Sequence, residues 1–201
     1  MTVYDDEFYD TITDGSVKSA EVVVPLVMEE YGPKTVVDVG CGRGVWGREF
    51  QEHGCHVLGV DGEYVVAPVI AFMAHDLTTP LPDDFGPFDL AVCLEVAEHL
   101  PESSADAFVA QLCNLSDTVL FSAAVPTQTG TDHVNCQYPS YWAEKFSDNG
   151  LGVVDKLRWK IWDDESVEPW YRQNIMVYQR GIEPSVPADV VHPVIHLWGR
   201  Q

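Results

Sequence analysis

The sequence contains few basic residues. Lysine and arginine total 11 against 32 aspartates and glutamates, which gives a formal net charge of −21. Proteins that bind nucleic acids usually present a basic face to the phosphates, so we expect no nucleic-acid partner. The excess carboxylates are expected to form solvated surface. Adaptation to high intracellular salt, where surface carboxylates keep a protein soluble, is the alternative.

Long apolar runs and paired cysteines are also absent from the sequence. No run approaches the roughly 20 apolar residues that span a bilayer. The first residues, MTVYDDEFYD, lack the basic-then-apolar order of a signal peptide. The five cysteines are scattered and none is spaced as CxxC, which argues against a disulfide framework or a structural zinc site. We therefore expect a cytoplasmic protein with no membrane partner.

The remaining pattern is that of one α/β domain covering residues 1–201, with 46% hydrophobic residues. Apolar, β-branched runs predict strands at 35–39, 56–60, 88–94, 119–124, 152–159 and 174–179. Amphipathic segments predict helices at 19–31, 45–53, 105–112 and 140–149. This alternation favours a mostly parallel sheet covered on both faces, with ligands at the carboxyl ends of its strands. The aromatic residues Trp159 and Tyr171 are expected to pack in the core or in a hairpin.

A glycine loop, Gly40-Cys41-Gly42-Arg43-Gly44, joins the first strand to a helix. Glycines let the backbone turn tightly and approach a ligand. The dinucleotide fingerprint would place glycine or alanine where this chain has Val45. Asp38 would repel a pyrophosphate but suits a cofactor that carries an ammonium and a sulfonium. Asp61 ends the next strand, where a carboxylate accepts both hydroxyls of a ribose in either type of cofactor.

Four motifs occur in an order typical of one enzyme class: DVGCGRG, VLGVDGEYV, FMAHDLTTPLP and FDLAVCLEVAEHLPE. Together they resemble class I S-adenosylmethionine (SAM)-dependent methyltransferases, and more narrowly the methyltransferase-domain family of bacteria, archaea and their viruses. GSVKSAEVVVPLV, LFSAAVPTQTGTDHVNCQYPSYWAEKF and WYRQNIMVY extend the resemblance to nearly the whole chain. It implies a three-layer α/β/α Rossmann-like sandwich with a mostly parallel seven-stranded sheet, the last strand antiparallel. Residues 1–30 would form an N-terminal arm and helix that cap the cofactor site.

The same resemblance assigns positions that bind the cofactor, SAM. They are Asp38, Gly40, Cys41 and Gly42 at its methionine end, Asp61 and Gly62 at its ribose, Asp76 and Leu77 at its adenine, and Glu95 facing both cofactor and acceptor. The chain departs from the family at Cys136-Gln137-Tyr138, where an acidic-Gln-Trp sequence is expected.

Candidate catalytic residues follow from the chemistry of methyl transfer. The protein must mainly orient the acceptor and exclude water, and a general base helps if the acceptor is a hydroxyl. His133, in the loop at 127–137, is a candidate base or acceptor ligand, the alternative being a loop histidine satisfied by backbone contacts. His99 and Glu98 are the other candidate bases, on a helical turn where His99 would share a face with Glu95. For His99 a packing role is the alternative.

A metal site is not expected from the sequence. His133 and Cys136 with Glu95 and His99 have suitable donor atoms, but nothing supplies a second close pair of ligands. The leading hypothesis is a methyltransferase, monomeric or homodimeric, that acts on an oxygen or nitrogen of a small polar acceptor such as a saccharide, a nucleotide-sugar or a natural-product intermediate. The alternatives are an NAD-dependent oxidoreductase or epimerase with a similar first βαβ unit, and a catalytically inactive SAM-binding protein.

The acidic composition leads to a first prediction. If the net charge of −21 reflects adaptation to high salt, raising KCl to molar concentration should increase the free energy of unfolding, because salt screens the repulsion between carboxylates. Urea denaturation at several KCl concentrations measures this. A free energy of unfolding that stays constant up to molar KCl would leave only the solvated-surface explanation.

Overall fold

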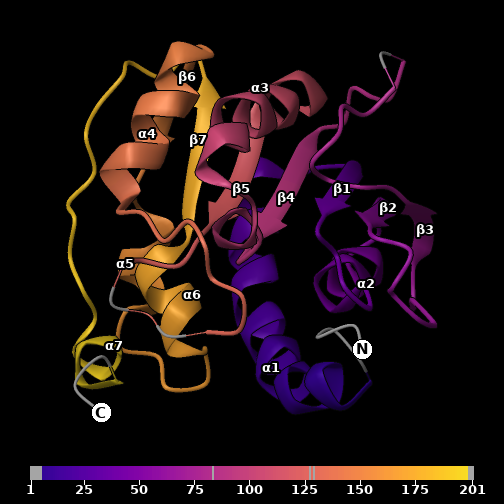
Figure 1. Ribbon diagram of the computed structural model, residues 1–201, viewed down its shortest axis with the longest axis horizontal. Coiled ribbons are helices and arrows are strands. Elements are labelled where there is room, and N and C mark those ends of the chain that lie inside the picture. Colours follow the sequence, from indigo (N-terminus) through magenta and orange to yellow (C-terminus); the bar gives the residue numbers. More distant parts are fainter. Residues whose placement is uncertain (1–5, 83, 127, 129, 199–201) are drawn as a thin grey trace.

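The computed structural model describes residues 6–82, 84–126, 128 and 130–198. A seven-stranded sheet lies at its centre, in the order β3-β2-β1-β4-β5-β7-β6 (Figure 1). The strands are β1 (Thr35–Val39), β2 (His56–Asp61), β3 (Ala71–Ala74), β4 (Leu90–Leu94), β5 (Thr118–Ser122), β6 (Leu151–Val154) and β7 (Met176–Arg180). Strands β1 to β5 pair in parallel, and β7 runs antiparallel to both of its neighbours. The predicted fold class is therefore confirmed.

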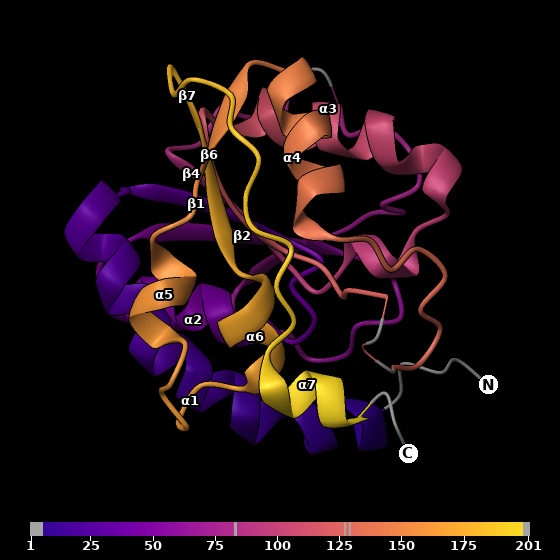
Figure 2. The same ribbon diagram turned by 90° about the vertical axis from the view of Figure 1, so that its left-hand side faces the viewer.

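Helices cover both faces of the sheet. They are α1 (Asp6–Tyr31), α2 (Val45–Glu52), α3 (Ala105–Leu115), α4 (Pro139–Asp148), α5 (Leu157–Ile161), α6 (Pro169–Asn174) and α7 (Pro193–Trp198), with short 3-10 turns η1 (Ala97–His99) and η2 (Glu102–Ser104). Figure 2 shows α3 and α4 on one side of the strands and α1, α2 and α5 on the other. No helix in the described part of the chain is long and apolar enough to cross a membrane.

Two apolar layers fill the space between the sheet and its helices. Under α3 and α4, Phe121 and Tyr178 of the sheet pack against Trp142 and Phe146 of α4. The Phe146 and Tyr178 rings stack with centroids 3.8 Å apart. On the opposite face, α1 and α2 cover the sheet with a second cluster that includes Phe50. The continuous burial of β4 on both faces explains why its sequence is apolar throughout.

Most of the predicted elements are present, and the predicted strands other than 152–159 begin and end within two residues of the observed bounds. The prediction of a strand at 152–159 is wrong after Val154, because α5 starts at Leu157. There Arg158 is fully buried, and its Nε and Nη2 donate to the carboxylate of Asp155 at 2.7 and 2.6 Å. The helix predicted at 19–31 begins earlier, at Asp6.

The two aromatic residues expected in the core have different positions. Tyr171 is buried, as predicted. Trp159 is 47% exposed and lies over the Arg158 guanidinium, 4.7 Å from ring centroid to Cζ. The expectation that Trp159 packs in the core or in a hairpin is therefore wrong, because residues 157–161 form the helix α5 and this ring lies on its exposed side.

The packing of α4 leads to a prediction about stability. Phe146→Ala should lower the free energy of unfolding by about 3–5 kcal/mol, because the ring is fully buried between Tyr178 and Phe121. Urea denaturation measures the change. Trp159→Ala is the matched control, since it removes an aromatic ring that is half exposed. An equal loss in the two variants would contradict the assignment of Phe146 to the core.

Candidate functional site

A cavity of about 830 Å³ opens at the carboxyl ends of β1 to β4. This volume falls within the range of ligand pockets, roughly 300–1,000 Å³. The segments that follow these four strands line it, and α1, α2 and α6 close it with Ser16, Val45, Trp46 and Tyr171. Its position is the one expected for a ligand site in an open parallel sheet.

The glycine loop after β1 forms one wall of this cavity. Gly40, Cys41 and Gly42 all border it. Gly40 has a φ of +77°, and a Cβ there would come within 2.2 Å of the Val96 side chain. Glycine is therefore required by the close approach of the turn after β4, as well as by the tight turn itself.

Asp38 lies behind this loop and does not line the cavity. Its carboxylate is buried and accepts a hydrogen bond from the backbone N–H of Gly47, at 3.2 Å. Burial raises the pKa of Asp38 to about 7, with a further increase from the nearby Asp61 carboxylate and an opposing effect of the Gly47 hydrogen bond. Asp38 therefore contacts the first turn of α2, which follows the glycine loop.

Asp61 holds the loops after β1 and β2 together. Its Oδ2 accepts from the N–H of Gly42 at 2.8 Å, and its Oδ1 accepts from the N–H of Gly62 at 2.7 Å and from the hydroxyl of Tyr64. The Tyr64 ring lies against Gly62, where a Cβ would meet it at 2.1 Å. The carboxylate thus faces a site where a ligand hydroxyl would compete with the hydroxyl of Tyr64.

The far end of the cavity is formed after β3. Asp76 and Leu77 both line it. Asp76 is exposed, and its Oδ1 accepts hydrogen bonds from the N–H and the hydroxyl of Thr78, at 2.9 and 2.7 Å. These two hydrogen bonds lower the pKa of Asp76, so it is an anion near neutral pH.

The wall from α2 and α6 was not predicted from the sequence, whereas residues 1–30, which include Ser16 of α1, were expected to cap the site. The Tyr171 hydroxyl lies 3.3 Å from Ser16 Oγ and accepts a hydrogen bond of the same length from Trp46 Nε1. These residues are separated by 155 and 125 positions from Tyr171. Only the fold brings them together, and the sequence carries no local signal for the contact.

Glu95 is the centre of a polar network at the turn after β4. Its carboxylate accepts from Gln128 Nε2 at 2.7 Å and from Asn174 Nδ2 at 3.1 Å, and Asn174 also donates to Gln128 Oε1 at 2.9 Å. Glu95 has a φ of +54°, an unfavourable conformation for a residue with a side chain. Desolvation raises the pKa of its carboxyl, opposed by the hydrogen bonds from Asn174 and Gln128. Sequence reasoning found Glu95 but missed Gln128 and Asn174.

His99 and His133 lie next to each other, with ring centroids 4.9 Å apart. His99 lines the cavity, whereas His133 is not among its lining residues and lies beyond His99. Burial lowers the pKa of both rings, and in His99 the neighbouring His133 lowers it further. The expected i, i+4 face shared by Glu95 and His99 is wrong, because the turn is a three-residue 3-10 helix preceded by the left-handed Glu95.

Nine of the eleven residues predicted for the site border this cavity: Gly40, Cys41, Gly42, Asp61, Gly62, Asp76, Leu77, Glu95 and His99. The other two do not border it: Asp38 accepts from the N–H of Gly47 in α2, and His133 lies next to the lining residue His99. The wall contains four carboxylates, Asp61, Glu63, Asp76 and Glu95, and one arginine, Arg43. Such a lining suits a cationic ligand with ribose hydroxyls better than a pyrophosphate.

Fold and cavity together are those of class I methyltransferases, and comparison with known proteins agrees. Residues 21–168 match the model of the methyltransferase domain, so the chain belongs to the methyltransferase-domain family. This confirms the class expected from the sequence, methyltransferases with SAM as methyl donor.

The individual proteins that match this chain have low sequence identity to it or match only part of it. The ubiquinone biosynthesis O-methyltransferase of Pseudomonas paraeruginosa is 34% identical over 86 residues, which are 36% of each chain, so the match spans about a third of that relative. The magnesium protoporphyrin IX methyltransferase of Synechocystis, solved with bound S-adenosylhomocysteine, has a TM-score of 0.64 at 22% identity and covers 88% of both chains. An O-methyltransferase family protein of Burkholderia thailandensis has a TM-score of 0.67 at 15% identity, covering 87% of this chain and 59% of that one.

Asp38 should make the unliganded protein less stable as the pH rises. Its pKa of about 7 exceeds the ordinary value of 3.8, so between these values the folded state holds a proton that the unfolded state has lost. The free energy of unfolding should fall across this window by up to roughly 4 kcal/mol. Urea denaturation of the wild type and of Asp38→Asn over this range measures the difference. The same pH dependence in both proteins would contradict the raised pKa.

Proposed function

We propose that this chain transfers a methyl group from SAM to an oxygen or nitrogen atom of a small polar acceptor. The observation that carries the proposal is the arrangement of the cavity wall. Carboxylates at the ends of β2 and β3 border one part of it, and the polar turn with Glu95 and His99 borders the other. The first part of the cavity would hold the methyl donor and the second the acceptor, so that the two meet in one cavity.

The residues present suit the proposed donor. Gly40, Cys41 and Gly42 would lie along its methionine end, with Asp38 supporting the loop from below. Asp61 would accept from the ribose hydroxyls, which replace the single hydroxyl of Tyr64. Asp76 and Leu77 would receive the adenine. When bound, SAM supplies an activated methyl group on a sulfonium.

The acceptor would lie against the turn after β4. Glu95 is held by the amides of Gln128 and Asn174, so its position is fixed before any ligand binds. His99 borders the cavity and His133 supports it from the loop after β5. In this arrangement the protein acts mainly by orienting the acceptor and excluding water. The first part of the chain contributes Ser16 of α1, which supports a capping role for residues 1–30.

An NAD-dependent oxidoreductase is the less favoured alternative. Its cofactor carries a pyrophosphate, and the four carboxylates of the cavity wall would repel it. Calorimetry separates the two possibilities, since we expect binding of S-adenosylhomocysteine and none of NADH. A catalytically inactive SAM-binding protein would also bind S-adenosylhomocysteine but would transfer no methyl group to any member of a panel of saccharides, nucleotide-sugars and natural-product intermediates.

Asp61→Ala should weaken the binding of S-adenosylhomocysteine by about 1.5–3 kcal/mol, or roughly 10- to 150-fold, because charged hydrogen bonds to the ribose are lost. Isothermal titration calorimetry measures this. Asp148→Ala is the control, since it removes an exposed carboxylate at the end of α4, outside the cavity lining.

A complementary variant tests the same assignment from the opposite side. Tyr64→Phe removes the hydroxyl that occupies Asp61 and should leave the affinity for S-adenosylhomocysteine unchanged or increase it. An affinity that does not change in Asp61→Ala would refute the ribose assignment.

A further inference from the structure

Glu98 is a buried acid whose carboxylate has no evident partner. Its side chain is fully buried, and neither carboxylate oxygen has a hydrogen-bond partner in the described part of the chain. An unpaired carboxylate in the interior is costly, and buried charges are usually paired or bound to a metal ion. Burial and the negative charge of Glu95, which is itself engaged by Gln128 and Asn174, raise the pKa of Glu98, and the nearby backbone of Ala124 lowers it in part.

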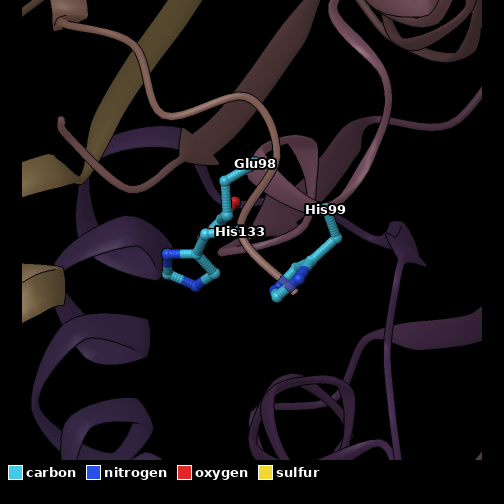
Figure 3. Close-up of side chains that lie close together, drawn as sticks. All are labelled: Glu98, His99 and His133. Carbon is cyan, nitrogen blue, oxygen red and sulfur yellow. The ribbon is translucent and has the colours of Figure 1, made fainter. Parts of the chain in front are cut away.

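Two histidines converge on the same place from different segments. Donor atoms of Glu98, His99 and His133 all lie within 4.8 Å of one another. Figure 3 shows the Glu98 and His99 side chains coming from the turn after β4 and the His133 side chain from the loop after β5. This loop is fixed to the turn by hydrogen bonds from the N–H groups of Val134 and Asn135 to the carbonyl oxygen of Glu98, at 2.8 and 2.9 Å. The convergence is therefore built into the backbone.

Backbone groups lie beside both rings. The backbone of Asp132 raises the pKa of His99 and the backbone of Gln128 raises that of His133, each against the larger effect of burial. Histidines that bind metals commonly use one ring nitrogen for such a contact and the other for the ion. His133 Nδ1 also lies 3.6 Å from Cys136 Sγ, a weak contact that an ion would replace.

We propose that Glu98, His99 and His133 bind one divalent transition-metal ion at the wall of the cavity. Ligand atoms bound to one ion, with bonds of about 2.1 Å, lie roughly 3 to 4 Å from one another. The donor atoms here lie within 4.8 Å of one another, so small side-chain movements would bring them to these distances. One carboxylate with two imidazoles favours an ion such as Zn²⁺ or Co²⁺ over Mg²⁺ or Ca²⁺, which prefer oxygen ligands. Since His99 lines the cavity, the ion would lie where the acceptor is proposed to bind. Only this last step rests on the proposed function.

Metal binding is tested directly on the whole chain. Equilibrium dialysis with Zn²⁺ and absorption titration with Co²⁺ are carried out with excess Mg²⁺, which occupies weak sites among the many surface carboxylates. We expect one ion per chain and the Co²⁺ absorption of a site with nitrogen ligands. A chain that binds no Zn²⁺ or Co²⁺ tightly enough to resist Mg²⁺ would overturn the proposal.

Variants locate the site. Glu98→Gln and His133→Ala should each weaken binding by more than the roughly 10- to 100-fold lost with an outer-shell partner. His56→Gln is the matched control, because it removes an exposed histidine at the start of β2. Equal binding in wild type, Glu98→Gln and His133→Ala would place the ion elsewhere and overturn the assignment.

Two further measurements keep the test independent of folding and of the proposed function. Without metal, Glu98→Gln should be at least as stable as the wild type, because it removes an unpaired buried acid, and Zn²⁺ should raise the Tm of the wild type alone. If Glu98→Gln does not fold, the metal affinity of His133→Ala alone decides whether the ion binds at this site. Glu98→Gln should bind S-adenosylhomocysteine like the wild type, whereas Asp61→Ala should bind it roughly 10- to 150-fold more weakly and keep the ion. Failure of one proposal is therefore distinguishable from failure of the other.

Discussion

The carboxylate of Asp61 ties together the two loops on which the site depends. One of its oxygens accepts from Gly42, after β1, and the other from Gly62, after β2. Parallel strands end at the same edge of a sheet, so without such a link their loops would leave backbone N–H groups unsatisfied around the cavity. A charged acceptor makes stronger hydrogen bonds than a neutral one. The part of the cavity bordered by these two loops, where the donor is proposed to bind, is thus shaped before a ligand arrives.

The part of the cavity where the acceptor is proposed to bind depends on a second constraint, the close packing of the turns after β1 and β4. Val96 fills the space that a Cβ on Gly40 would occupy. The turn after β4 must therefore follow a defined path, in which Glu95 takes a left-handed conformation and directs its carboxylate toward Gln128 and Asn174. The next turn of chain then places Glu98 and His99 beside the loop that carries His133. The loop after β1 and the turn after β4 are therefore in direct contact at Gly40 and Val96.

Sequence reasoning succeeded where the signal was local. The strand and glycine loop around Gly40 and the acid at Asp61 are short, contiguous patterns, and the structure brings both to the cavity. It failed where distant segments decide. Alternating charged and apolar residues at 156–160 read as a strand, yet Arg158 is buried against Asp155 and the carbonyl oxygens of Gln173 and Ala188, which fixes a helical turn. Likewise, nothing near Glu98 in the sequence shows that His133 lies beside it.

The site concentrates negative charge, because four carboxylates and one arginine, Arg43, line its cavity. Asp38, Asp61, Glu95 and Glu98 gather at one edge of the sheet, and burial raises the pKa of three of them, Asp38, Glu95 and Glu98. The fully buried Arg158 is committed to Asp155, away from this edge. Like charges held together in a region of low dielectric destabilise the unliganded protein, and any cation that enters offsets this cost. The sulfonium of SAM and a divalent ion would reduce the repulsion at different carboxylates of this cluster. The same acidic edge of the sheet is therefore compatible with both proposed ligands.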